Sequence, residues 1–227
     1  MMDRVGAVVP AGGRSARMAG VDKLFALLGG RPLLCWCVEA LEAYADMAEI
    51  VVAVAPERMT EARRLARERG WAKTRLVEGG ARRQDSVANG LAALGAVDWV
   101  LVHDGDRPFL DAALIADGLR AARTTGVAVA SVPLKDTVKR IGGDGTVVAT
   151  LERDMLRAVQ TPQVFRADII RRAYADSSET VTDDAMLAER LGYAVRLYDG
   201  AYDNLKVTTP DDLVVAEVFA RRRGGQT

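Results

Sequence analysis

The first segment with an evident chemical use follows the first apolar run of the chain. After Val5–Val9 come, in order, Pro10, Ala11, Gly12, Gly13, Arg14, Arg17 and Lys23. Backbone N–H groups of a glycine-rich turn can bind phosphate oxygens, and guanidinium and ammonium groups neutralise their charge. The spacing fits neither G-x-G-x-x-G nor G-x-x-x-x-G-K-[ST]. It favours a loop for a triphosphate attacked at its α-phosphorus over a glycine-rich turn with solvated basic residues.

A second group of polar residues follows the apolar run Trp99–Val102. These residues are His103, Asp104, Asp106 and Arg107. Carboxylates beside phosphates commonly bind Mg²⁺, which prefers oxygen ligands from both, so Asp104 is a candidate metal ligand. Arg107 either belongs to the site or anchors the acidic pair. His103 invites a role as general base, but a buried, hydrogen-bonded histidine is the favoured interpretation.

A double glycine after another strand-like run is the third candidate. Gly79 and Gly80 leave room for a flat group against the backbone, whose amides can contact a base edge. Ser86 follows near the start of an expected helix. The sequence leaves two roles for it open, a helix cap and a ligand contact.

Further polar residues are scattered through the second half of the chain. They are Thr137, Arg153, Arg157, Thr161, Gln163, Thr182, Asp183, Asp184, Asn204, Lys206 and Thr208. Thr182 before acidic residues is an ordinary helix start. Lys206 lies between Leu205 and Val207 in a strand-like segment, so we expect it to face a ligand.

These residues need elements that bring them together, and the pattern supplies strands alternating with helices. Such alternation predicts an α/β fold with a mostly parallel sheet, helices on both faces and ligands at the carboxyl ends of the strands. The expected strands are Val5–Val9, Ile50–Ala55, Thr74–Val77, Trp99–His103, Val127–Val132 and Ala194–Tyr198. The expected helices are Pro32–Ala45, Glu57–Arg69, Asp85–Leu94, Asp111–Thr124, Asp168–Tyr174, Thr182–Leu191 and one from Pro210.

Residues 133–165 interrupt this rhythm. A turn cluster, Gly142–Gly145, separates the partly alternating segments Thr137–Ile141 and Thr146–Leu151, which predicts a β-hairpin. A lone hairpin buries little surface, so we expect it to pack on another subunit. The resulting organisation is one domain, residues 1–227, with residues 134–160 as a dimerisation arm.

Composition limits the class of protein. The 227 residues include 31 Lys plus Arg and 31 Asp plus Glu, a balance that argues against a general nucleic-acid binder. There is no long uncharged apolar run and no signal-peptide profile, so we expect a cytoplasmic protein without a membrane span. Cys35 and Cys37, two apart in an expected helix, suggest buried, inert thiols rather than a metal or redox site.

Taken in order, the motifs resemble those of the 2-C-methyl-D-erythritol 4-phosphate cytidylyltransferases, a family of the non-mevalonate isoprenoid pathway. The similar stretches span nearly the whole chain, and the most specific are "DNLKVT-x-PDDL" and "TPQ-x-F". They are Pro10–Lys23, Gly79–Val87, His103–Pro108, Asp136–Lys139, Thr161–Phe165, Thr182–Asp184 and Asp203–Asp212. The resemblance implies a Rossmann-like fold, CTP, Mg²⁺ or another divalent cation, and a homodimer formed through the hairpin arm.

The resemblance also implies roles for individual residues. Arg17 and Lys23 would be catalytic, stabilising charge at the α-phosphate. Pro10, Ala11, Gly12, Gly13, Gly79, Gly80, Ser86 and Asp104 would bind the nucleotide, with Asp104 also at the metal. Arg107, Thr137, Arg153, Thr161, Thr182 and Lys206 would bind the acceptor, several of them from the partner's arm. A phosphate oxygen is already a nucleophile at neutral pH, so no strong base is required.

The chain departs from the family pattern at three places. The spacing from Met18 to Lys23 is one residue short, Ala81 stands where an acidic residue often contacts cytosine, and Asp106 adds a charge beside the expected metal. A cytidylyltransferase for another polyol phosphate, such as ribitol 5-phosphate, is the main alternative. An NAD(P) dehydrogenase does not fit the glycines. A non-catalytic nucleotide-binding protein would not need Arg17, Lys23, Asp104 and Lys206 together.

Overall fold

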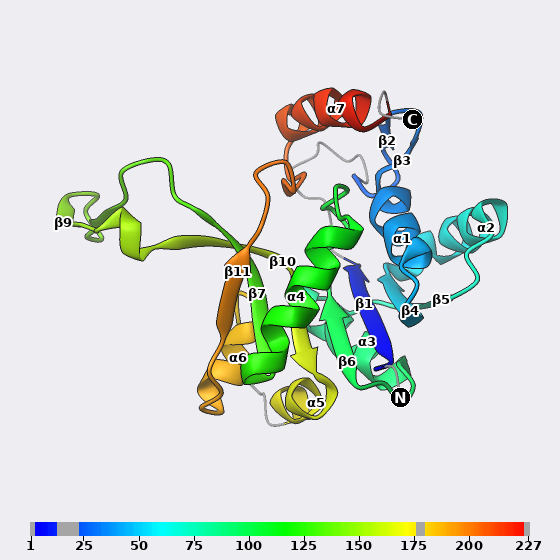
Figure 1. Cartoon of the computed structure of the whole chain (residues 1–227). Coiled ribbons are helices and arrows are strands. Elements are labelled where there is room, and N and C mark those ends of the chain that lie inside the picture. The colour runs from blue at the N-terminus through cyan, green and yellow to red at the C-terminus, as the bar shows by residue number, and fades with distance from the viewer. Residues whose placement is uncertain (1–2, 13–22, 176–179, 225–227) are drawn as a thin grey trace.

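The computed structural model describes residues 3–12, 23–175 and 180–224 of the chain. Across these residues one seven-stranded sheet runs through the molecule in the order β11-β7-β10-β6-β1-β4-β5 (Figure 1). Its strands are β1 (Val5–Ala11), β4 (Met47–Val54), β5 (Thr74–Glu78), β6 (Trp99–Val102), β7 (Val127–Pro133), β10 (Arg157–Arg166) and β11 (Arg196–Asp199). Neighbouring strands are parallel except at β10, which is antiparallel to both β6 and β7.

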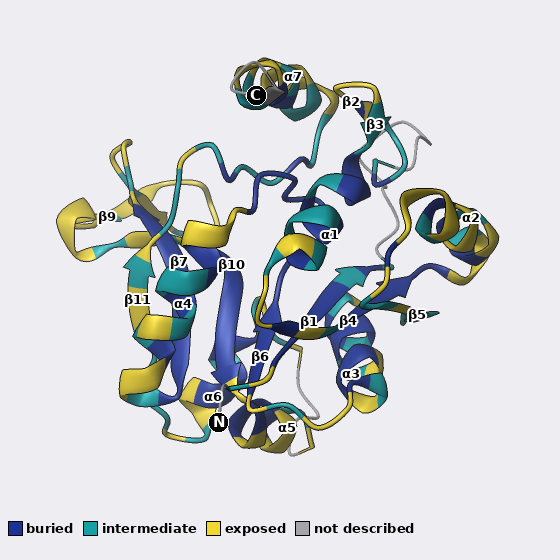
Figure 2. Cartoon of the chain, turned by 45° about the vertical axis from the view of Figure 1, so that its right-hand side comes forward, coloured by how far each residue is buried: buried dark blue, intermediate teal, exposed yellow. Residues whose placement is uncertain are grey.

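Helices cover both faces of this sheet, as the sequence predicts. Alternate residues of a strand point to opposite faces, so Ala7 and Val9 of β1 join one buried cluster and Val8 joins the other. The first cluster includes α1 (Leu33–Ala43), α2 (Met59–Arg69), α4 (Ala112–Thr125) and α7 (Pro210–Gly224). The second includes α3 (Arg83–Ala93), α5 (Ala167–Ala175) and α6 (Ala185–Arg190). The central strands are accordingly buried along their length (Figure 2).

Local sequence signals account for several boundaries. The helix α4 begins after Asp111, whose carboxylate accepts a hydrogen bond from the Leu114 amide at 2.9 Å, and it ends at Gly126 with φ 83°. A short hairpin of β2 (Leu27–Leu28) and β3 (Arg31–Pro32) precedes α1. A 3-10 turn, η1 (Pro56–Arg58), precedes α2. In the part of the chain described, no helix is long and apolar enough to cross a membrane.

The strand β10 is absent from the sequence-based expectations, and this omission is an error of the prediction. Gln160, Thr161 and Gln163 lie within it, are buried, and interrupt the apolar pattern that marks the other strands. The strand inserts between β6 and β7 and completes the sheet, and the Thr161–Pro162 peptide within it is cis.

A second expectation is also wrong. The residues around Lys206 form no strand but an irregular segment. That segment is fixed at one point by the Val207 amide, which donates to the Asp106 carbonyl at 2.9 Å.

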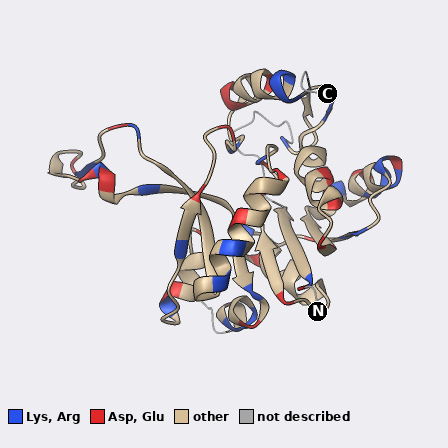
Figure 3. Cartoon of the chain, viewed as in Figure 1, with Lys and Arg blue, Asp and Glu red and all other residues tan. Residues whose placement is uncertain are grey.

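The predicted hairpin is confirmed and extends away from the sheet (Figure 1). It consists of β8 (Lys139–Ile141) and β9 (Val147–Thr150), followed by the 3-10 turn η2 (Arg153–Met155). Its apolar side chains are exposed: Ile141, Val147, Val148, Leu151 and Met155. Charged residues of both signs are interspersed over the helices (Figure 3).

Candidate active site

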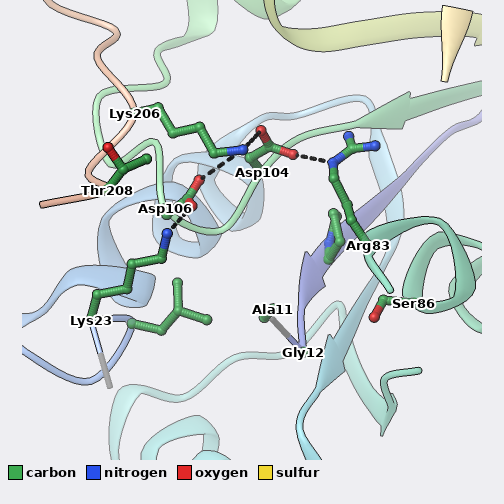
Figure 4. A pocket seen from close by; sticks show the side chains of 11 residues that line it. Ala11, Gly12, Lys23, Arg83, Ser86, Asp104, Asp106, Lys206 and Thr208 are labelled. Atoms are coloured by element: carbon green, nitrogen blue, oxygen red, sulfur yellow. Dashed lines mark hydrogen bonds and ion pairs between the residues drawn. The ribbon is translucent and has the colours of Figure 1, made fainter. Parts of the chain in front are cut away.

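A cavity of about 190 Å³ opens at the carboxyl ends of β1 and β6. The strand β1 has β6 on one side and β4 on the other, and such a switch in strand order is where open α/β sheets bind ligands. The lining residues come from five separate stretches of the described chain (Figure 4). They are Pro10, Ala11, Gly12, Lys23, Leu24, Arg83, Ser86, Asp104, Asp106, Lys206 and Thr208.

Cations and carboxylates alternate across the cavity. The Lys23 ammonium lies 2.5 Å from Asp106 Oδ2, and the Lys206 ammonium lies 2.8 Å from Asp104 Oδ2 (Figure 4). Lys206 is also 3.9 Å from Asp106 Oδ1. The two lysines therefore face each other across two buried carboxylates, which is an arrangement suited to binding anionic groups from two sides.

The two carboxylates differ in their ionisation. Burial opposes ionisation of Asp104, but the charges of Arg83 and Lys206 outweigh it and hold the pKa of Asp104 below its usual range. Burial and the Asp104 charge together raise the pKa of Asp106, and Lys206 and Lys23 offset this only in part. Asp104 is thus the firmly charged member of the pair.

Two glycines bring separate backbone segments into contact beside the cavity. A Cβ on Gly12 would lie 2.9 Å from Ser86 Oγ and 3.2 Å from the Gly79 Cα, and a Cβ on Gly79 would lie 3.1 Å from the Gly12 Cα. Neither position has space for a side chain. Ser86 Oγ accepts from the Gly80 amide at 3.1 Å and lies 3.2 Å from the Arg82 carbonyl, so this hydroxyl fastens the double-glycine turn to α3.

Asp104 is supported from beneath by a buried hydrogen-bonded group. The Asp104 amide donates to Thr161 Oγ1 at 3.0 Å, and that hydroxyl lies 3.2 Å from His103 Nδ1. His103 Nε2 is 2.9 Å from the Arg107 carbonyl. Burial lowers the pKa of His103 to about 4, so the ring is neutral at pH 7. The interpretation of His103 as a buried, hydrogen-bonded residue is confirmed.

Arg107 lies in the same support. Its guanidinium is buried and donates to the Asn204 carbonyl at 2.7 Å, with Asp104 Oδ2 3.9 Å from Nε. This geometry fits an anchoring role better than direct contact with a small molecule. The two cysteines are free and buried in α1, as expected.

The structure brings together most of the nucleotide-binding residues predicted from sequence, together with the predicted catalytic Lys23 and the predicted acceptor residue Lys206. Pro10, Ala11, Gly12, Ser86, Asp104, Lys23 and Lys206 line the cavity, and Gly79 and Gly80 lie beside Ser86. Thr161 lies beneath Asp104, and Thr182 is exposed just before α6. Gly13 and Arg17 lie outside the described residues.

Two predicted acceptor residues lie elsewhere. Thr137 and Arg153 belong to the projecting arm, where Arg153 donates to the Lys135 carbonyl at 2.8 Å. Neither lines the cavity of its own chain as described.

Three polar residues that line the cavity have no assigned role from sequence. Asp106 stands out only as an extra charge, and Thr208 only as one of many scattered hydroxyls. Arg83 is adjacent to Arg82, and its position as the first residue of α3 is the signal that places it at the cavity. Arg82 instead points outward and pairs with Asp85.

The residues present fit a divalent cation that is held mainly by phosphate oxygens of a bound substrate and by one carboxylate oxygen of the protein. Among the described residues, no group of three or more His, Cys, Asp or Glu side chains gathers as a metal site. Both oxygens of Asp104 accept from cations. Asp106 Oδ1 is buried at the cavity, and no described residue donates a hydrogen bond to it. One carboxylate oxygen together with phosphate oxygens is a typical environment for Mg²⁺.

Comparison with known proteins now identifies the family. Residues 5–222 match the sequence model described as IspD, 2-C-methyl-D-erythritol 4-phosphate cytidylyltransferase. The chain belongs to this family. It is 47% identical over 221 residues to the enzyme of that name from Dehalococcoides mccartyi, covering 97% of each chain.

Solved structures agree with this assignment. The 4-diphosphocytidyl-2C-methyl-D-erythritol synthase of Anaerococcus prevotii superposes with a TM-score of 0.87 at 29% identity, covering 96% of both chains. The 2-C-methyl-D-erythritol 4-phosphate cytidylyltransferase of Thermus thermophilus has a TM-score of 0.75 at 35% identity, covering 97% of this chain and 100% of that one. The expected Rossmann-like α/β fold and the expected enzyme class, a cytidylyltransferase, are both confirmed.

Proposed function

We propose that this IspD family member transfers the cytidylyl group of CTP to 2-C-methyl-D-erythritol 4-phosphate. The products are 4-diphosphocytidyl-2-C-methyl-D-erythritol and pyrophosphate. The observation that carries the proposal is the placement of Lys23 and Lys206 on opposite sides of one cavity at the strand ends. This gives one ammonium for the triphosphate and one for the acceptor phosphate.

The reaction joins two phosphates by in-line displacement. An oxygen of the acceptor phosphate attacks the α-phosphorus of CTP, and the bond from that phosphorus to the bridging oxygen of the β-phosphate breaks. The electron pair leaves with pyrophosphate. Because the attacking oxygen is already ionised at neutral pH, positioning and charge neutralisation supply the catalysis. A neutral, buried His103 agrees with the lack of need for a general base.

Each lysine has a distinct part in this scheme. Lys23 neutralises charge at the α-phosphoryl group as pyrophosphate departs, and Arg17, outside the described residues, is proposed to assist. Lys206 binds the acceptor phosphate and aims it at the α-phosphorus. On ligand binding each lysine exchanges a carboxylate partner, Asp106 or Asp104, for phosphate oxygens.

The nucleotide is proposed to lie along the two glycine segments. Pro10, Ala11 and Gly12 face the triphosphate, with Gly13, outside the described residues, proposed to join them, and Gly79, Gly80 and Ser86 lie where a flat base can pack on backbone. Asp104 stands between the nucleotide side and Lys206. Ala81 is exposed beside this turn, so base recognition there rests on backbone groups rather than on an acidic side chain.

A divalent cation, Mg²⁺ by preference, is proposed to bind with the triphosphate. When bound, it neutralises phosphate charge and so favours attack at the α-phosphorus. Asp106 Oδ1 is the carboxylate oxygen suited to it, with Asp104 adjacent. The same residues also balance the charge of the two lysines.

The arm is proposed to complete the site of a second copy. The whole chain, residues 1–227, would act as one nucleotidyltransferase domain with residues 134–160 as its dimerisation arm. Exposed apolar side chains on the arm, and the fact that Thr137 and Arg153 do not line the cavity of their own chain as described, support a homodimer. In that dimer Thr137 and Arg153 contact the acceptor in the partner. A cytoplasmic location stays a prediction.

The test is pyrophosphate release from CTP and Mg²⁺ with either of two acceptors. The proposal expects rapid release with 2-C-methyl-D-erythritol 4-phosphate and little with ribitol 5-phosphate. Turnover of ribitol 5-phosphate alone would assign the chain to another polyol phosphate, and release with neither acceptor would contradict the proposal.

A further inference from the structure

Arg83 joins two buried carboxylates that belong to different parts of the fold. Its Nε donates to Asp104 Oδ1 at 2.7 Å, and its Nη2 donates to Asp184 Oδ2 at 2.7 Å. Asp104 and Asp184 are only 6% and 1% exposed. A guanidinium is suited to this position because its planar fork can donate to two acceptors at once.

The far end of this bridge is firmly anchored. Asp184 immediately precedes α6, and its Oδ1 accepts from the Tyr174 hydroxyl of α5 at 2.5 Å. Both oxygens of Asp184 therefore have charged or polar donors. The anchor lies two residues after Thr182, in the segment proposed to contact the acceptor.

The near end of the bridge leads to the acceptor lysine. Asp104 uses Oδ1 for Arg83 and Oδ2 for Lys206, so its carboxylate lies between two cations (Figure 4). The series Tyr174, Asp184, Arg83, Asp104 and Lys206 thus connects α5 and α6 to the cavity. Loss of the guanidinium would leave two buried carboxylates without their main counter-charge.

We propose that Arg83 is a positioning residue that fixes Asp104, and through it Lys206, relative to the acceptor segment before α6. The role rests on the proposed function, because Lys206 is taken to bind the acceptor phosphate. Arg83 contacts neither reacting phosphate in this scheme. Its removal is therefore expected to act more on the placement of the acceptor than on nucleotide binding.

The neighbouring Arg82 supplies a matched control. It is exposed, pairs with Asp85, and donates to Thr180 Oγ1 at 3.1 Å. Arg82 therefore ties the same segment to α3 without touching Asp104. Arg82→Gln removes one positive charge and one tether from the same turn, so it separates a general tether from the specific connection to Asp104.

The experiment compares Arg83→Gln, Arg83→Lys, Asp184→Asn and Arg82→Gln with the wild-type enzyme. For Arg83→Gln we expect the acceptor KM to rise about tenfold or more and kcat to fall, while the Kd for CTP changes by less than about threefold. Asp184 lies outside the cavity lining. Asp184→Asn should change the acceptor KM and kcat in the same directions, but by smaller factors. Arg82→Gln should keep all three parameters close to the wild type.

Arg83→Lys covers the case in which Arg83→Gln folds poorly. A lysine keeps the charge but its single ammonium does not span both carboxylates, so we expect a smaller loss of melting temperature than in Arg83→Gln, together with a raised acceptor KM. An unchanged acceptor KM in both Arg83 variants would overturn the inference. So would an equal rise in Arg82→Gln, or a parallel weakening of CTP binding. A wild-type enzyme that uses neither acceptor would overturn the proposed function itself and this role with it.

Discussion

Lys23 and Lys206 lie 2.5 and 2.8 Å from their carboxylate partners, so both ammonium groups are already paired within the chain. A triphosphate and an acceptor phosphate must each replace such a pair. Because phosphate oxygens carry more charge than one carboxylate, this exchange is favourable when the ligand is present. The residues thus keep a preformed site without leaving buried cations uncompensated.

Lys23→Ala tests the residue proposed to act on the α-phosphoryl group. We expect kcat to fall about 10²–10³-fold, the size seen when one electrostatic stabiliser is removed from an active site. The melting temperature should change little, because the lysine lies at the cavity edge rather than in the apolar core. Steady-state rates and a thermal melt measure both. Near-normal turnover in the folded variant would remove Lys23 from the mechanism.

Asp106→Ala tests the second carboxylate of the cavity, which pairs with Lys23. Removing the carboxylate takes away a group that repels the triphosphate and pairs with Lys23, so CTP should bind more tightly in the absence of metal. It also removes the candidate metal oxygen, so added Mg²⁺ should help less. We expect the ratio of the CTP Kd values in EDTA and in Mg²⁺ to fall severalfold, measured by calorimetry. An unchanged ratio would show that Asp106 neither repels the nucleotide nor contacts the cation.

The sequence alone predicts those site residues that belong to a motif or occupy a characteristic place in an element. Asp104 and Lys206 belong to recognisable motifs, and glycines at a strand end predict a close backbone approach. Arg83 and Arg82 are two identical side chains in a row, and only the helix phase of α3 decides which one faces the cavity. The orientation of Arg83 therefore had to come from the structure.

At the scale of elements, β6 and β10 form the floor of the site. The strand β6 ends at Val102, and the next residue, His103, is bonded to the β10 residue Thr161, whose hydroxyl accepts from the Asp104 amide. The strand β10 was missed because three of its buried residues, Gln160, Thr161 and Gln163, are polar. These residues are polar because they support the site. Their polarity breaks the apolar pattern by which the other strands are predicted from the sequence.

His103 predicts how stability depends on pH. Its folded pKa of about 4 lies below the ordinary 6.5 because of burial, so between these values the unfolded chain binds a proton that the folded chain does not. Stability should therefore fall as the pH drops from 6.5 towards 4, by roughly 3 kcal/mol from this residue.

The measurement is urea unfolding of wild type and His103→Gln between pH 7.5 and 4.5. Carboxylates contribute to both proteins, so the difference in slope isolates the histidine, and we expect the flatter slope in the variant. His103 is the one histidine of the sequence, so NMR titration of its ring can be assigned directly. A ring pKa near 6.5 in the folded protein would contradict this account.

At the scale of the whole molecule, the sheet and its two helical layers could be predicted from alternation, but the arm's partner could not. The arm carries apolar side chains at Ile141, Val147, Val148 and Met155 that are more than half exposed. Exposed apolar surface on a projecting hairpin marks an interaction site. The surface against which the arm packs would belong to a second chain. The hydrophobic pattern of one sequence predicts contacts within that chain and does not identify such a surface.

Val147→Asp combined with Val148→Asp tests the proposed dimer. The wild type should have twice the 24.4 kDa chain mass by light scattering, and the double variant should be monomeric. Turnover should fall with it, since Thr137 and Arg153 are proposed to reach the partner's cavity. Val214→Asp with Val215→Asp, equally exposed on α7, is the control and should stay dimeric and active. A fully active monomer would contradict the role of the arm.

The central claim is transfer of the cytidylyl group, and the position of an isotopic label tests it most directly. Two reactions run with 2-C-methyl-D-erythritol 4-phosphate and Mg²⁺, one with CTP labelled at the α-phosphate and one with CTP labelled at the γ-phosphate. We expect the α-label in the nucleotide–acceptor product and the γ-label in pyrophosphate. A γ-label found in a phosphorylated acceptor, or an α-label found only in free CMP, would contradict it.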